Sequence, residues 1–141
     1  MKKLIAIFIL ITSIGSVFAF AQKDGGQKKP DIYFTELTFD FGQIADNKPV
    51  THDYIFYNSG TAPLLLKNVK PSCGCTTPIW TRQPIKPGDS GKISVTFDPK
   101  GDAGKVVSKT ITVTTNIDDK GQDKTVTLYI KGKVMAGSES N

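Results

Sequence analysis

Side chains that commonly carry catalysis or hold metals are scarce in this sequence. Its 141 residues include one histidine, one tryptophan and two cysteines. The Gly-rich phosphate loop, the Gly-x-Ser-x-Gly turn and the His-Glu-x-x-His motif are missing, and with them the marks of nucleotide-binding enzymes, serine hydrolases and zinc proteases. Because an active site needs several converging polar groups, the sequence favours a non-enzymatic protein, and we expect no cofactor.

A long apolar run occurs only at the start of the chain. Two lysines precede an apolar segment from Leu4 to Ile11, and the small residues Ala19 and Ala21 follow it. This order is typical of a secretory signal peptide, and the segment is shorter than the roughly 20 residues of a membrane-spanning helix. We therefore expect residues 1–21 to be removed by cleavage after Ala21, or alternatively after Ala19. The protein is then exported to the periplasm or the cell exterior without a membrane anchor.

The charge of the chain is modest and mixed in sign. The formal net charge is +5, and signal cleavage lowers it to +3 because the expected signal peptide contributes two lysines and no acidic residue. Elsewhere the basic residues are interspersed with acidic ones rather than clustered, which argues against nucleic-acid binding. We therefore expect a protein partner and no nucleic acid.

The remainder of the sequence divides into a leader, one domain and a tail. Residues 22–30 are rich in Gly, Gln and Lys, a composition typical of a flexible leader. Residues 31–135 carry the regular apolar pattern, and their length suits a single domain with its own core. Residues 136–141 have almost no apolar content, and we expect them to form a disordered tail.

From residue 31 onward, apolar and polar residues alternate over short runs that Gly, Pro, Asn and Asp interrupt. A period of two with many Val, Ile, Thr and aromatic residues predicts β-strands and no helix. About seven strands separated by regular turns predict an all-β fold, an immunoglobulin-like antiparallel β-sandwich. The phase of the alternation predicts a core that contains Phe39, Phe41, Tyr54, Phe56, Leu64, Leu66, Ile93, Val95, Phe97, Ile111, Val113, Leu128 and Ile130.

Two places depart from this alternation. Near Thr35 and Glu36 the apolar phase shifts by one residue, so we expect a bulge or a switch of the chain between sheets. From Trp80 to Ile85 we expect an irregular connection.

The Cys–Trp–Cys spacing of antibody domains is absent, because the two cysteines are only two residues apart. Packing of the core must therefore supply most of the stability.

Several short segments together resemble one known family. They are Phe-Asp-Phe-Gly at 39–42, Phe-Tyr-Asn-Ser-Gly at 56–60, Ser-Cys-Gly-Cys-Thr at 72–76, Pro-Ile-Lys-Pro-Gly at 84–88, Val-Thr-Phe-Asp at 95–98 and Ile-Lys-Gly at 130–132. On these segments the chain resembles the DUF1573 family over nearly the whole of residues 31–135. The resemblance implies an immunoglobulin-like domain related to the ASPM/SPD-2/Hydin type, found mostly in exported bacterial proteins. It implies no established activity and no catalytic residues.

Both cysteines lie in the stretch 71–78, Pro-Ser-Cys-Gly-Cys-Thr-Thr-Pro. An exported protein favours a disulfide between Cys73 and Cys75. Residues i and i+2 on an extended strand lie about 6.6 Å apart, near the upper limit for bridging, and Gly74 would let the chain bend to bring them closer. We expect this loop at one end of the sandwich, where the third strand leaves its sheet.

We take this loop and the tryptophan after it as the candidate functional site, which comprises Cys73, Gly74, Cys75, Thr76 and Trp80. Three roles remain open for the cysteines: a structural disulfide, two buried thiols, or redox and metal chemistry. For the tryptophan, a plug in the core is favoured over an exposed binding aromatic.

Metal binding is a weaker hypothesis for the same loop. Two thiolates at this spacing suit Cu(I), which makes Cys73 and Cys75 weak metal candidates. A closed zinc site would need four ligands, and the sequence places neither His52 nor Met135 near the loop.

The sequence therefore supports two hypotheses about function. The favoured one is an exported non-enzymatic immunoglobulin-like module that binds a protein or has a structural role in the periplasm or at the cell exterior. The alternative is a thiol redox or Cu(I)-handling protein that uses the Cys-Gly-Cys loop. The redox state and metal content of the two cysteines would distinguish them.

Overall fold

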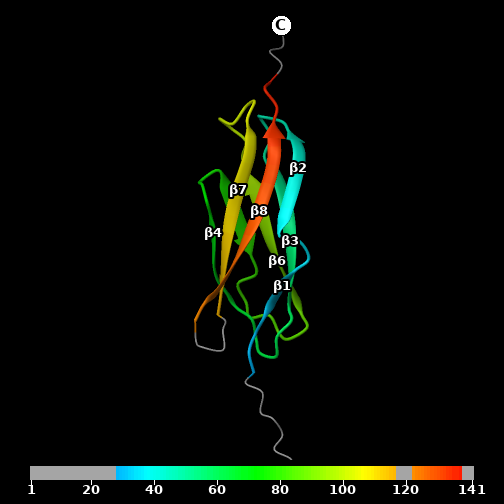
Figure 1. Cartoon of the computed structure of the whole chain (residues 1–141), viewed down its shortest axis with the longest axis vertical. Coiled ribbons are helices and arrows are strands. Elements are labelled where there is room, and N and C mark those ends of the chain that lie inside the picture. Colours follow the sequence, from blue (N-terminus) through cyan, green and yellow to red (C-terminus); the bar gives the residue numbers. More distant parts are fainter. Residues whose placement is uncertain (1–27, 117–121, 138–141) are drawn as a thin grey trace, which may run out of the picture.

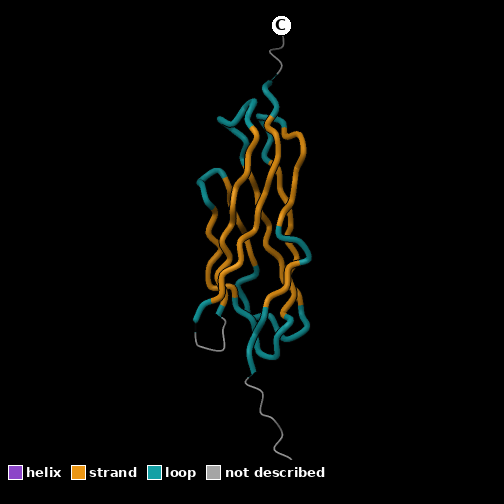
Figure 2. The backbone as a smooth tube through the Cα atoms, viewed as in Figure 1, coloured by secondary structure: helices purple, strands orange, loops and turns teal. Residues whose placement is uncertain are grey.

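Eight β-strands and the loops between them make up the computed structural model, which describes residues 28–116 and 122–137 (Figures 1 and 2). No helix occurs within these ranges, and none of their residues form a helix able to cross a membrane. The strands are β1 (Ile32–Phe34), β2 (Thr38–Ile44), β3 (Val50–Asn58), β4 (Leu66–Pro71), β5 (Thr76–Trp80), β6 (Ser90–Phe97), β7 (Val106–Thr115) and β8 (Lys124–Val134).

The strands form two four-stranded sheets that pack face to face (Figure 1). We name them sheet 1, with the order β1-β3-β6-β5, and sheet 2, with the order β2-β8-β7-β4. The all-β sandwich expected from the sequence is confirmed, with eight strands where about seven were predicted. The strand that the pattern did not predict is β5, because Thr76, Thr77 and Pro78 lack apolar alternation and directly follow the cysteines.

The chain changes sheets between β1 and β2. β1 belongs to sheet 1 and β2 to sheet 2, so of the two expected possibilities, a bulge or a sheet switch, the phase shift near Thr35 and Glu36 is the sheet switch. One consequence departs from the prediction: β2 pairs with β8 in parallel, so sheet 2 is mixed rather than antiparallel. The chain keeps its direction from β1 into β2, and β8 runs in that same direction, so β2 and β8 pair in parallel.

The core lies between the two sheets; seven strands supply buried apolar residues to it, and β5 adds the half-buried Trp80. Of the predicted core residues, all are buried except Phe39 and Phe41, which are half-buried and pack against the core from its side. These two belong to β2, an edge strand, where the opposite sheet covers a side chain on only part of its surface. The core also includes buried residues outside the predicted list: Ile32, Phe34, Ile44, Val69, Ile85, Val107 and Val134.

The turn after β3 is held by a buried amide. Asn58 donates from Nδ2 to the carbonyl oxygens of Ala62 at 2.7 Å and Ile85 at 2.9 Å. Its Oδ1 accepts from the amides of Gly60 at 2.9 Å and Asp31 at 3.3 Å. A Cβ on Gly60 would lie 2.3 Å from the Asp31 nitrogen, so only glycine allows the chain to pass this closely. The amide therefore joins three loop segments at one end of the sandwich.

Both ends of the described chain are anchored. The carbonyl of Lys29 accepts from Thr61 at 2.7 Å, so the chain joins the fold slightly before the expected boundary at residue 31. At the other end, the amide of Gly137 donates to Asp46 Oδ2 at 3.0 Å, within the expected tail. The expected signal peptide and most of the expected leader lie outside the described residues.

Candidate functional site at the Cys73–Cys75 loop

The candidate loop joins the edge strands of opposite sheets. β4 is the last strand of sheet 2 and β5 the last strand of sheet 1, so residues 72–75 cross from one sheet to the other along the side of the sandwich. In Figure 1 this green connection lies beside β7. The loop does leave β4 as expected, but it lies on the side rather than at one end, because β7 continues past the level of the loop to Val106.

The two sulfurs are bonded to each other. Cys73 and Cys75 form a disulfide with their Cα atoms 5.3 Å apart, shorter than the spacing of an extended strand. Of the roles left open by the sequence, the structure therefore contains the disulfide. The buried-thiol role does not apply to the bonded form, and both cysteines remain partly exposed.

Backbone hydrogen bonds hold the loop independently of the sulfurs. Ser72 donates its amide to the Thr110 carbonyl at 2.9 Å and accepts the Thr110 amide on its own Oγ at 3.1 Å. On the other side, Asp98 donates its amide to the Cys75 carbonyl at 2.8 Å. Sheet 2 therefore fixes the start of the loop, and sheet 1 fixes its end.

Thr76 lies directly beneath the disulfide. Its side chain is buried, and its hydroxyl lies 3.6 Å from Cys73 Sγ and 3.9 Å from Cys75 Sγ. Its amide donates to the Cys73 carbonyl at 3.3 Å and closes the turn. Thr76 is thus the polar side chain that contacts both sulfurs.

Gly74 does not have the role that the sequence suggested. It is absent from the glycines with positive φ, and a Cβ at this position would meet no atom within 4 Å. The bend is made instead by the disulfide and by the turn between Cys73 and Thr76, both of which use ordinary backbone angles. An alanine would therefore fit here.

Two prolines occupy the free edges on either side of the loop. The Asp98–Cys75 and Thr81–Lys92 bonds set the register of β5, so Pro78 faces away from β6, toward the open edge. The Ser72–Thr110 bond likewise places Pro71 at a position of β4 that faces away from β7. Proline has no amide hydrogen, so each edge lacks a donor where an added strand would need one.

Trp80 turns inward rather than outward. It is half-buried and packs against the core, as the favoured plug hypothesis predicts. The guanidinium of Arg82 lies 3.5 Å from the centre of its ring and covers it from outside. Trp80 therefore closes the gap between the sheets and offers no free aromatic face to a partner. Its Nε1 is buried without a hydrogen-bond partner in the described chain.

The structure does not bring His52 to the cysteines. His52 lies on β3, its Nε2 is 2.9 Å from Glu36 Oε1, and its ring stacks on Phe39 at 3.6 Å. In sheet 1, β6 separates β3 from β5. Met135 donates its amide hydrogen to the carbonyl of Ile44 on β2, which is the opposite edge of sheet 2 from β4.

Among the described residues, no group of three or more His, Cys, Asp or Glu side chains could hold a metal ion. A Cu(I) site made by the two sulfurs would first require reduction of their bond.

A surface that the sequence analysis missed lies on the outer side of sheet 1. Tyr33 and Tyr57 stand opposite each other on β1 and β3 and are 60% and 41% exposed, and Ile79 on β5 is 71% exposed. We call these three residues the apolar face. Part of the signal was present in the sequence, because Tyr57 follows the predicted core residue Phe56 and Ile79 precedes Trp80, the expected core plug. Alternation alone does not reveal which outward residues share a sheet.

Charge on this side of the molecule is neutralised locally. The carboxylate of Asp53 pairs with Lys92 Nζ at 2.9 Å and accepts a hydrogen bond from Ser94. The Ser94 hydroxyl and the Lys92 ammonium hold the pKa of Asp53 below its usual value. The carboxylate therefore stays ionised and paired between the tyrosine pair and Ile79.

Comparison with protein families gives one match. The model described as "Protein of unknown function (DUF1573)" matches residues 32–134. No curated protein matches the chain.

Solved structures share the fold at low sequence identity. A protein of unknown function from Porphyromonas gingivalis W83 is 23% identical with a TM-score of 0.61, over 74% of this chain and 46% of its own. A PapD-like domain of human CEP192 is 11% identical with a TM-score of 0.62, over 76% of this chain and 87% of its own. The chaperone-tip adhesion subunit complex CsuC–CsuE of Acinetobacter baumannii is 12% identical with a TM-score of 0.53, over 74% of this chain and 56% of its own. This chain thus spans less than half of the Porphyromonas protein, and the likeness extends to the fold alone.

Proposed function

We propose, from the premise that the chain belongs to the DUF1573 family of unknown function, that it is an exported, non-enzymatic module that binds a protein partner. The observation that carries the proposal is the apolar face, where two tyrosines and an isoleucine are exposed on one sheet. The two tyrosines are direct cross-strand neighbours, and exposed aromatic side chains that lie side by side are typical of protein-binding sites. Ile79 lies on the same face, beyond the Asp53–Lys92 pair.

The mode of binding follows from the edges of the sheets. Pro71 and Pro78 remove amide donors from the open edges of β4 and β5. On the short edge strand β1, the Ile32 amide is already bonded to Asp31 Oδ1 at 2.9 Å. Strand addition needs a row of free donors and acceptors, so these edges disfavour it. Both edges of sheet 1, which carries the apolar face, are among them. A partner of that sheet therefore docks on side chains, with Tyr33, Tyr57 and Ile79 as its anchors.

The disulfide loop supports this role through rigidity. Both of its ends are hydrogen-bonded to neighbouring strands, and the bond between the sulfurs fixes the residues between them. A preordered surface loses less conformational entropy on binding than a flexible loop. We assign the loop the task of holding the start of β5, and with it Ile79, in a fixed position.

Site-specific photo-crosslinking in the producing cell tests the proposal. A photoreactive phenylalanine analogue replaces Ile79 in one variant and Val106 in another. Val106 is the matched control, because it is a β-branched residue that is 80% exposed on the outer side of sheet 2. We expect a defined protein adduct at position 79 that Tyr33→Asp abolishes, and no such adduct at position 106. Equal adducts at both positions, or none at position 79, contradict the proposal.

Thiol redox chemistry remains the second candidate, and one observation favours it. The bonds that hold Ser72 and Cys75 do not involve the sulfurs, so a reduced pair would stay within reach of reoxidation. Titration of the thiols in defined glutathione mixtures tests this candidate. A pair that stays fully oxidised in strongly reducing mixtures contradicts it.

A further inference from the structure

The outer face of sheet 2 differs in chemistry from the apolar face. Its two central strands, β7 and β8, present mainly hydroxyl and ammonium groups to the outside. These outward residues alternate from Ser108 to Thr114 on β7 and from Thr125 to Lys133 on β8. We call this set the hydroxyl face.

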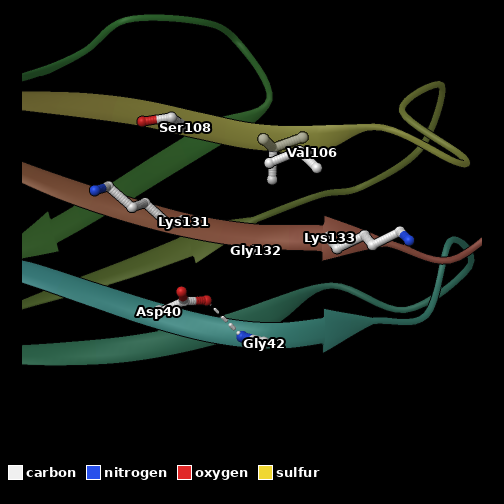
Figure 3. A pocket seen from close by; sticks show the side chains of 8 residues that line it. Asp40, Gly42, Val106, Ser108, Lys131, Gly132 and Lys133 are labelled. Atoms are coloured by element: carbon white, nitrogen blue, oxygen red, sulfur yellow. Dashed lines mark hydrogen bonds between the residues drawn. The ribbon is translucent and has the colours of Figure 1, made fainter.

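An open groove of about 310 Å³ lies at the upper part of the hydroxyl face (Figure 3). It is lined by Asp40 from β2, by Val106 and Ser108 from β7, and by Lys131 and Lys133 from β8. The pairing of β2 with β8 shifts register directly beside it. Figure 3 shows the two lysines on the central strand, with β7 on one side and β2 on the other.

The two lysines of the groove have no ion-pair partner among the described residues. Within residues 28–116 and 122–137, no carboxylate lies within ion-pair distance of Lys131 or Lys133. The acidic residue of the groove, Asp40, already accepts the Gly42 amide on Oδ1 at 2.7 Å. Elsewhere carboxylates pair with Lys67, Lys92, Lys105, Lys109 and Lys124. The groove therefore holds two ammonium groups and one carboxylate, and its net charge is positive.

We propose that the hydroxyl face binds an anionic polysaccharide, with sugar carboxylates against Lys131 and Lys133. The two ammonium groups stem from positions i and i+2, roughly 7 Å apart along β8, which suits successive charged groups of an extended polymer. Ser108 and Tyr129 supply hydroxyls beside them for the sugar hydroxyls.

Two features favour a sugar polymer over an acidic polypeptide. β7 and β8 are central strands with neighbours on both sides, so their backbone groups are already bonded and cannot pair with a peptide main chain. In the described structure the face exposes two large apolar side chains, Val106 and Tyr129. Tyr129 pairs with Thr110, four residues along β7 from Val106, so the two do not form a cluster of anchors for a protein partner. This site is separate from the apolar face, so the two proposals stand or fall independently.

Binding measurements with defined polymers test the site. The probes are polygalacturonate, neutral dextran and poly-L-glutamate, each titrated into the purified protein at low and at moderate salt. The variant K131Q/K133Q removes the two charges of the groove. The matched control K48Q/K86Q removes two exposed lysine charges from loops elsewhere.

We expect polygalacturonate to bind, to weaken as salt rises, and to bind K131Q/K133Q roughly tenfold less tightly than the control variant. Dextran should not bind. An equal loss in both variants would mean that net charge alone attracts the polymer and would overturn the proposal. Equally tight binding of poly-L-glutamate would identify an acidic polypeptide as the ligand and overturn it too, as would the absence of binding by any probe.

Discussion

Replacing Asn58 with alanine tests the hydrogen-bonded turn at the end of β3. The change removes two donated and two accepted hydrogen bonds of a side chain that is almost fully buried. One of the orphaned groups keeps another partner, because the Ile85 carbonyl also accepts the Leu64 amide at 2.8 Å. The bond to Asp31 is long at 3.3 Å, so of the four partner groups two lose a full bond without replacement and a third loses a weak one.

At about 1 kcal/mol for each lost bond, and more where a buried group is left unpaired, we expect Asn58→Ala to lower the free energy of unfolding by roughly 3 kcal/mol. Urea unfolding followed by the fluorescence of Trp80 measures the change. Asn68→Ala is the matched control, since Asn68 is exposed on β4, and its effect should stay within about 0.5 kcal/mol. A loss below about 1 kcal/mol at Asn58, with an unchanged urea slope, would refute the view that this amide holds the loops together.

Further predictions concern glycine, the disulfide and acid. Gly91→Ala should lower stability by about 1–3 kcal/mol in urea unfolding, because its Cβ would lie 2.3 Å from a buried aromatic ring, whereas Gly74→Ala should be neutral or slightly stabilising. Replacing Cys73 and Cys75 with serine should leave the circular dichroism spectrum intact and cost under about 2 kcal/mol, because the closed loop is very short; loss of folding would make the disulfide essential. A lysine hydrogen bond holds the pKa of Asp31 below its usual 3.8, so its stabilising effect is present above that pH and lost as the pH falls below it. Relative to Asp31→Asn, the wild type should therefore lose its advantage between about pH 5 and 2 in pH-resolved unfolding, and a constant difference would contradict this.

The strands of the core were predictable because burial on one face of a sheet leaves a period of two in the sequence. Ile93, Val95 and Phe97 show this on β6, and all three are fully buried. β5 was not predictable in this way, since Pro78 and the two threonines before it read as loop. Its pairing with β6 is decided by tertiary contacts.

The candidate site was predictable in composition but not in place. The sequence located the two cysteines and favoured a disulfide among three open roles, yet which strands flank the loop depends on the order of strands in the sheets. β4 is an edge strand of sheet 2 and β5 an edge strand of sheet 1, so the loop that joins them lies on the side of the sandwich and not at the predicted end. The faces made by Tyr33 and Ile79, and by Lys131 and Lys133, depend on the same order, and so the sequence did not reveal them.

The parallel pairing of β2 with β8 has a consequence for the time course of folding. It joins Thr38 to Tyr129, residues near opposite ends of the domain, and β7 then pairs with the other side of β8. Sheet 2 therefore lacks its second central strand until the last part of the chain is available. Contacts this distant in sequence form slowly, because a long loop must close before they contribute. A chain that crosses a membrane from its N-terminus would stay unfolded during most of its passage and would complete its sandwich only after β8 has emerged.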